Sequence, residues 1–152
     1  MKYISVLILT SITAWSSLVD DRFLKAVSLI ESGGKPNAKG DYLKGVPRAL
    51  GEFQFWRSTW DSVTAMRRSQ GLPTKPYHTG ATTSLSTEYA RTYLKWCEKG
   101  LKRNGVKSPT RGQIYAAYNC GLTSFKRRGF KLSRCPSHTQ RAAERIERLC
   151  RK

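Results

Sequence analysis

The chain has 152 residues, of which 39% are hydrophobic, and its 28 lysines and arginines outnumber its 10 aspartates and glutamates. This length supports one compact domain and excludes two full-sized ones, and the hydrophobic fraction excludes a disordered chain. The formal net charge of +18 favours an anionic partner, but it does not choose between a nucleic acid, a membrane surface and an acidic wall polymer.

The first 16 residues are typical of a signal peptide. Lys2 supplies a positive charge, residues 3–15 are mostly apolar, and Ala14 and Ser16 place small residues before a cut after Ser16. The apolar stretch is shorter than the roughly 20 residues that a membrane-spanning helix needs. We therefore predict a signal peptide at 1–16, a single domain at 17–152 and a secreted or periplasmic location. The alternative is an N-terminal core helix that continues into the next segment.

Helical periodicity begins directly after this segment. A first helix is predicted to start at Asp20 and Asp21, to bury Phe23 and Val27 on one face, and to end at Gly33. Residues 35–55 contain too many glycines and prolines for a long helix, so we expect loops or a small β-hairpin there.

Four further helices are expected downstream, which makes the fold class mainly α. The chain is predicted to form a single domain of about five helices with a small irregular or β-hairpin insert after the first helix. The third helix should end at Gly100. The predicted start signals are Ser58 paired with Asp61, then Ser84 or Ser86, and the capping boxes Thr110-x-x-Gln113 and Ser137-x-x-Gln140.

All four cysteines lie in the last part of the chain. An even number in an exported protein indicates two disulfides, and we favour Cys120 with Cys135 and Cys97 with Cys150. The alternative is four buried free thiols. The sequence has only two histidines and no Cys-x-x-Cys pair, so we expect no metal site and no cofactor.

Glu31 is the candidate proton donor. Leu24, Val27 and Glu31 are spaced i, i+3, i+7, so the carboxyl group shares an apolar helix face. Apolar surroundings disfavour the charged form and raise the pKa, which suits proton donation to a weakly basic glycosidic oxygen near neutral pH. Taken alone, the position at a helix end favours a solvated surface residue.

The surrounding motifs change that interpretation. They resemble, in order and spacing, the signature motifs of the lytic transglycosylase and goose-type lysozyme superfamily, over about residues 23–121. The resemblance implies a lysozyme-like fold and cleavage of the β-1,4 bond between N-acetylmuramic acid and N-acetylglucosamine in peptidoglycan glycan strands. The motifs are Glu31-Ser32-Gly33-Gly34, Gly51-x-x-Gln54 and Ala117-Tyr118-Asn119. Residues 84–94 (SLSTEYARTYL) are also similar to the family's helix that precedes the last motif.

The resemblance also implies a role for each matching residue. Glu31 would be the catalytic acid, and Ser32 would hydrogen-bond near it or to the substrate. Tyr118 would lie over Glu31 and help to hold it. Gln54 would contact the sugar, Gly51 would allow close backbone approach, and Asn119 would bind a substrate amide. Local alternatives stay open: helix capping for Ser32, a core aromatic for Tyr118, and a helix C-cap for Asn119. Cys120, between Asn119 and Gly121, departs from the family pattern.

Two chemical outcomes remain open. In lytic transglycosylases one glutamate suffices, because the 6-hydroxyl of the muramic acid attacks and leaves a 1,6-anhydro product, and we favour this outcome. In goose-type lysozymes an aspartate between the first two motifs helps water attack, and Asp41 is the candidate here. As alternatives, Asp41 is a turn residue and Glu52 a surface partner of an arginine.

The basic residues concentrate near the C-terminus. We expect this surface to hold the enzyme, as a monomer, on anionic wall or envelope polymers, and we expect no nucleic-acid partner because no such binding module is present. One alternative is a solvated face paired with Glu144 and Glu147, and another is a non-catalytic cationic wall-binding or antimicrobial protein. The basic residues are Lys126, Arg127, Arg128, Lys131 and Arg134, followed by Arg141, Arg145, Arg148 and Lys152.

Overall fold

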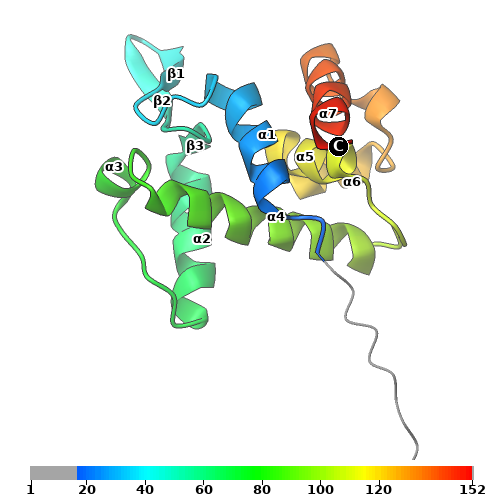
Figure 1. The fold of residues 1–152 in the computed structure, drawn as a ribbon, viewed down its shortest axis with the longest axis horizontal. Helices are drawn as coiled ribbons and strands as arrows, with labels where there is room; N and C mark the ends of the chain where they lie inside the picture. Colours follow the sequence, from blue (N-terminus) through cyan, green and yellow to red (C-terminus); the bar gives the residue numbers. More distant parts are fainter. Residues whose placement is uncertain (1–16, 152) are drawn as a thin grey trace, which may run out of the picture.

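The computed structural model describes residues 17–151, so the predicted signal peptide at 1–16 lies outside the described residues. The mainly helical fold with a small insert after the first helix is confirmed (Figure 1). No helix within residues 17–151 combines the length and hydropathy that crossing a bilayer requires. The elements are α1 (Asp21–Ser32), β1 (Lys39–Leu43), β2 (Val46–Leu50), β3 (Phe55–Trp56), α2 (Arg57–Ser69), α3 (Tyr77–Gly80), α4 (Leu85–Arg103), α5 (Arg111–Cys120), α6 (Leu122–Arg127), the 3-10 helix η1 (Leu132–Arg134) and α7 (Ser137–Cys150).

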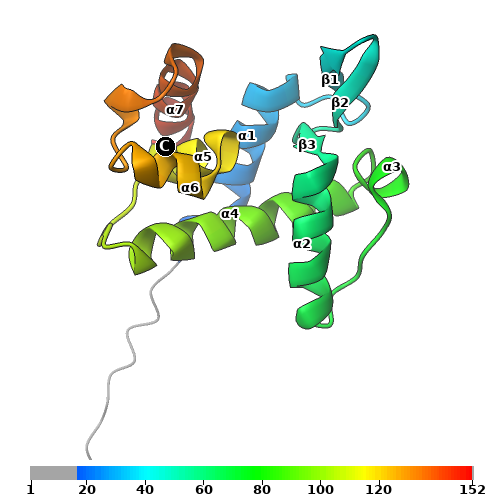
Figure 2. The same cartoon turned by 180° about the vertical axis from the view of Figure 1, so that it is seen from behind.

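The five predicted helices correspond to α1, α2, α4, α5 and α7. The sequence did not indicate α3, α6 and η1, because elements of four, six and three residues are too short to show a helical period. The sheet and α7 lie on opposite sides of α1, and both views show α2 crossing α4 (Figures 1 and 2).

The insert is an antiparallel sheet of three strands in the order β1-β2-β3. Lys44 and Gly45 join the first two strands, and both have positive φ angles, 50° and 78°, as a tight two-residue hairpin turn requires. Leu43 pairs with Val46 across this turn. The hairpin prediction is therefore confirmed, and β3 extends it.

Helix α1 has well-defined ends. The Asp20 side chain accepts a hydrogen bond of 2.8 Å from the backbone N–H of Phe23 at its start. At its end, Gly33 adopts a left-handed conformation with φ of 67°, and its N–H donates to the carbonyl of Leu29. Phe23, Leu24 and Val27 are buried, as their spacing predicted, and the same face carries Glu31 inward.

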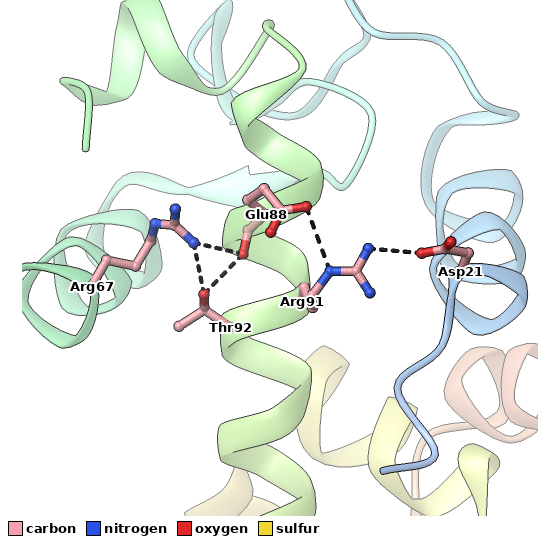
Figure 3. Close-up of polar contacts among 5 residues, drawn as sticks. All are labelled: Asp21, Arg67, Glu88, Arg91 and Thr92. Carbon is pink, nitrogen blue, oxygen red and sulfur yellow. Dashed lines mark hydrogen bonds and ion pairs between the residues drawn. The ribbon is translucent and has the colours of Figure 1, made fainter. Parts of the chain in front are cut away.

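Two arginines connect the helices that surround the core (Figure 3). Arg67 of α2 is buried, and its guanidinium donates to the carbonyl of Glu88 and the hydroxyl of Thr92 on α4, at 3.0 and 2.9 Å. Arg91 of α4 pairs with Asp21 of α1 at 2.8 Å. These contacts hold α1 and α2 at defined positions along α4, so the helices form a stable frame for the sheet and α5.

Three predicted helix signals are wrong. Ser58 does not begin a helix, since α2 starts at Arg57 with no side-chain cap. Gln140 forms no capping box, because its amide reaches back 2.7 Å to the carbonyl of Cys135. Gly100 does not end α4, which continues to Arg103; instead, it leaves space for Leu122, whose methyl would lie 2.3 Å from an added Cβ. The Thr110-x-x-Gln113 capping box is confirmed.

The two predicted disulfides are absent from the structure, in which all four cysteines are free thiols. Cys120 and Cys135 are neighbours, close enough for each thiol to affect the pKa of the other. The pairing of Cys97 with Cys150 is wrong, because Cys97 lies near Cys120 whereas Cys150 lies near charged groups at the start of α1 and α5.

Candidate active site

A cleft of about 520 Å³ opens between the sheet and the helices α4, α5 and α7. Its size is within the range that accommodates a sugar unit or a small ligand. Five residues singled out in the sequence line it, namely Glu31, Asp41, Gln54, Tyr118 and Asn119. Sequence reasoning missed the others, which are Ala49, Phe55, Trp56, Thr59, Tyr93, Gly121 and His138.

Glu31 reaches this cleft from the last turn of α1. Burial raises the pKa of its carboxyl from 4.5 to about 7, against the effect of hydrogen bonds from Tyr115 and Asn119, which lower it. The Tyr115 hydroxyl donates to Glu31 Oε1 at 2.8 Å. A carboxyl group of this kind holds its proton near neutral pH and can release it, so it is suited to general acid and then base chemistry.

The resemblance implied that Tyr118 helps to hold Glu31. In the structure the hydroxyl that donates to Glu31 belongs to Tyr115 instead. The Tyr118 hydroxyl donates to the carbonyl of Phe53 at 2.6 Å, and its ring packs against Tyr93 with centroids 5.4 Å apart. Burial raises the pKa of both tyrosine hydroxyls, which keeps them protonated as donors. Tyr115 and Asn119 are one turn apart on α5 and therefore share a helix face. This spacing was the signal in the sequence that could have indicated Tyr115 as a neighbour of Glu31.

The turn between β2 and β3 places Gln54 in the cleft. Gln54 has a left-handed backbone with φ of 48°, and its amide donates to the carbonyl of Gly51 at 2.9 Å. An added Cβ at Gly51 would lie 1.8 Å from the carbonyl oxygen of Ala81. The close approach at Gly51 is therefore made by the protein's own loop before α4, and Gly51 is not among the cleft-lining residues.

Ser32 has a structural role in place of the predicted substrate contact. Its hydroxyl donates to the carbonyl of Glu52 at 2.8 Å and accepts from the N–H of Lys35 at 3.0 Å. Glu52 accepts a hydrogen bond from the Ser28 hydroxyl and lines a separate, smaller cleft. The predicted arginine partner of Glu52 is thus replaced by a serine, and its carboxylate does not share the cleft of Glu31.

Asp41 and His138 bring two further ionisable groups to the cleft from opposite sides. Asp41 comes from β1, where its backbone has φ of 54°, and His138 comes from the first turn of α7. Both side chains are exposed to solvent. No group of three or more histidine, cysteine, aspartate or glutamate side chains within residues 17–151 is arranged to hold a metal ion.

The basic residues of α6, η1 and α7 form an exposed surface that we call the C-terminal basic surface. Glu147 forms no ion pair with these residues, and its carboxylate accepts from the N–H of Gly112 at 2.6 Å. Arg128 is half-buried and donates to Ser124. The ion pairs of the described residues include none of the exposed members, which are Lys126, Arg127, Lys131, Arg134, Arg141, Arg145 and Arg148.

Comparison with known proteins gives one family. A family model described as "Transglycosylase SLT domain" matches residues 9–133, which is most of the chain. Helix α7, which brings His138 to the cleft, lies beyond the matched residues. Neither the search of curated proteins nor the search of solved structures found a match.

Proposed function

The chain belongs to the transglycosylase SLT domain family, whose members cleave glycosidic bonds in peptidoglycan, and from this premise we propose that it is a lytic transglycosylase with Glu31 as catalytic acid and base. The bond cleaved is the β-1,4 link between N-acetylmuramic acid and N-acetylglucosamine. The observation that carries the proposal is the Glu31 carboxyl group, whose pKa burial raises to about 7 and which lines a sugar-sized cleft.

The reaction proceeds in two proton transfers. Protonated Glu31 gives its proton to the glycosidic oxygen as the bond from that oxygen to the anomeric carbon breaks. The 6-hydroxyl oxygen of the same muramic acid then bonds to the anomeric carbon, and its proton passes to the Glu31 carboxylate. The acid is regenerated, and the products are a 1,6-anhydro-muropeptide and a free 4-hydroxyl end.

The polar and aromatic lining of the cleft suits this substrate. Gln54 offers an amide for sugar hydroxyl or N-acetyl groups, and Trp56 and Tyr93 offer ring faces for the apolar faces of sugars. Trp56 is 40% exposed, and the Arg48 guanidinium lies over its ring at 3.9 Å from the centroid.

Hydrolysis is the second candidate, because Asp41 lines the same cleft as Glu31. In that reaction the Asp41 carboxylate would orient a water molecule that attacks the anomeric carbon, and the product would carry a reducing end. The lytic reaction needs no second carboxylate. Asp41→Asn therefore separates the two reactions, since it abolishes hydrolysis and leaves 1,6-anhydro products in place.

Mass spectrometry of muropeptides released from purified peptidoglycan tests the proposal. We expect 1,6-anhydro ends from the wild-type chain and at least a 1,000-fold lower rate from Glu31→Gln, about the loss expected when the sole proton donor is removed. Reducing ends would replace the lytic assignment with hydrolysis. Equal clearance of walls by Glu31→Gln would show a non-catalytic cationic protein.

We also propose that the enzyme is exported as a monomer and that the C-terminal basic surface holds it on anionic wall or envelope polymers. The supporting observation is the row of exposed cations that carry no acidic partner within the described residues. Nucleic acid is not proposed as a partner. Co-sedimentation of the Glu31→Gln chain with walls, before and after extraction of anionic polymers, measures this binding.

Charge reversal on α7 provides the matched comparison for that binding. Replacement of Arg141, Arg145 and Arg148 by glutamate should weaken the sedimentation and its dependence on salt. The control carries the same change in net charge on α4, at the exposed residues Lys95, Lys99 and Arg103. Equal weakening in both variants would show that net charge alone, and not this surface, holds the enzyme on the wall.

A further inference from the structure

Asn119 is held from two sides, by the proposed acid and by a residue of the last helix. Its side chain lines the same cleft as the Glu31 carboxyl, whose pKa it lowers, and the Thr139 hydroxyl of α7 donates to Asn119 Oδ1 at 2.8 Å. Thr139 is fully buried, whereas Asn119 is exposed at the cleft. The buried hydroxyl is thus the anchor on the protein side of an otherwise exposed side chain.

The orientation of the carboxamide follows from both of its neighbours, Thr139 and Glu31. A carboxamide has an accepting oxygen and a donating amino group, and a rotation of 180° exchanges them at little steric cost. Oδ1 accepts from Thr139, and because an ionised carboxylate can only accept, the amino group is the end that faces Glu31 when Glu31 is a carboxylate. An amino group stabilises the carboxylate, whereas an oxygen in its place would stabilise the protonated carboxyl.

We propose that Thr139 is a positioning residue, which orients the Asn119 amide so that its amino group donates to Glu31. This inference rests on the proposed function, because it concerns the group beside the proposed acid. It assigns to α7, which lies beyond the residues that match the family, a part in the reaction. The role falls in the second proton transfer, when Glu31 must be a carboxylate to accept the proton of the 6-hydroxyl.

Thr139 suits this role because it orients the amide without adding a charge to the cleft. The ionisable groups that line the cleft with Glu31 or contact it come from four elements. A movement of any of them would change the titration of Glu31. They are Asp41 of β1, Tyr93 of α4, Tyr115 and Tyr118 of α5, and His138 of α7. A test at Thr139 therefore replaces the hydroxyl by a methyl group of the same shape, which leaves these groups in place.

The experiment is a carbon-detected NMR titration of the Glu31 carboxyl in the full chain, with Glu31→Gln to assign its signal. In Thr139→Val we expect the midpoint to rise by about half to one pH unit, the effect of one lost hydrogen bond to the carboxylate. The alkaline limb of the rate–pH profile should shift to higher pH by the same amount as the Glu31 midpoint. Thr139→Ser, which retains the hydroxyl, should titrate like the wild type.

Two further variants separate positioning from a general structural effect. Thr64→Val removes a comparable hydroxyl contact of 2.9 Å, between α2 and α4, and should leave the Glu31 midpoint unchanged. In an Asn119→Ala background, Thr139→Val should have no added effect on the midpoint, since the group it orients is gone. Thermal unfolding of each variant shows whether the fold is retained, and Thr139→Ala replaces Thr139→Val if the latter does not fold.

An unchanged midpoint in Thr139→Val, a failure of Thr139→Ser to restore it, or a persistent shift in the Asn119→Ala background would each overturn the inference. The titration requires no substrate turnover. If the chain releases no muropeptides while the midpoint shifts as expected, the proposed function fails and the positioning of the Asn119 amide by Thr139 stands.

Discussion

The raised pKa of Glu31 makes a prediction about folding that does not depend on substrate. Burial raises the pKa from 4.5 in the unfolded chain to about 7 in the folded one. At roughly 1.4 kcal/mol per pH unit, the folded state loses about 3 kcal/mol of stability when this group ionises. The loss begins above pH 4.5 and is complete once the pH has passed 7, because below pH 4.5 the group is protonated in both states.

Glu31→Gln removes this loss, since glutamine keeps a neutral side chain of the same shape at every pH. We expect the free energy of unfolding of the wild type to fall by about 2.5 kcal/mol more than that of the variant between pH 5 and pH 8. Urea denaturation followed by tryptophan fluorescence, under reducing conditions to keep the four thiols free, measures both values.

The matched control for Glu31→Gln is Asp41→Asn, which removes a carboxylate from the same cleft at an exposed position. Its stability should follow that of the wild type through this pH range. If Glu31→Gln and the wild type lose stability in parallel from pH 5 to pH 8, Glu31 is not a buried acid, and the reasoning from burial to proton donation is refuted.

Tyr115→Phe removes the hydroxyl that donates to Glu31, the proposed acid, so the pH at which activity is half lost should rise by about half to one pH unit in a rate–pH profile. Gly51→Ala places a methyl group 1.8 Å from a backbone carbonyl and should lower the free energy of unfolding by more than about 2 kcal/mol. The control Gly71→Ala also has a positive φ but meets no atom within 4 Å, and should lose less. Oxidised glutathione should link Cys120 to Cys135, as mapped by mass spectrometry of an unreduced digest; a bond to another cysteine would contradict their contact.

The local features of α1 were predicted correctly. The cap at Asp20, the apolar stripe with Phe23 and Val27, and the stop at Gly33 depend on neighbours within a few residues, and together they define α1. The three motifs also identified residues that meet in one cleft, although residues 31, 54 and 119 are far apart in sequence.

Features set by tertiary packing were not predictable. Tyr115 and Tyr118 are both aromatic residues near the end of α5, and only the position of α1 determines which hydroxyl meets Glu31. No sequence motif marks Thr139, because its contact with Asn119 depends on the packing of α7 against α5. The pairing of Cys97 with Cys150 failed for the same reason, because spacing along the chain does not encode which thiols become neighbours.

The two defined ends of α1 have a consequence for the position of the acid. Asp20 begins the helix and Gly33 ends it, so Glu31 is placed by a fixed number of residues from each. One residue inserted between Asp20 and Glu31 would turn the carboxyl by about 100° around the helix axis and advance it by about 1.5 Å, out of the cleft. The length of helix α1 therefore fixes where the carboxyl lies, and the proposed reaction depends on that length as much as on Glu31 itself.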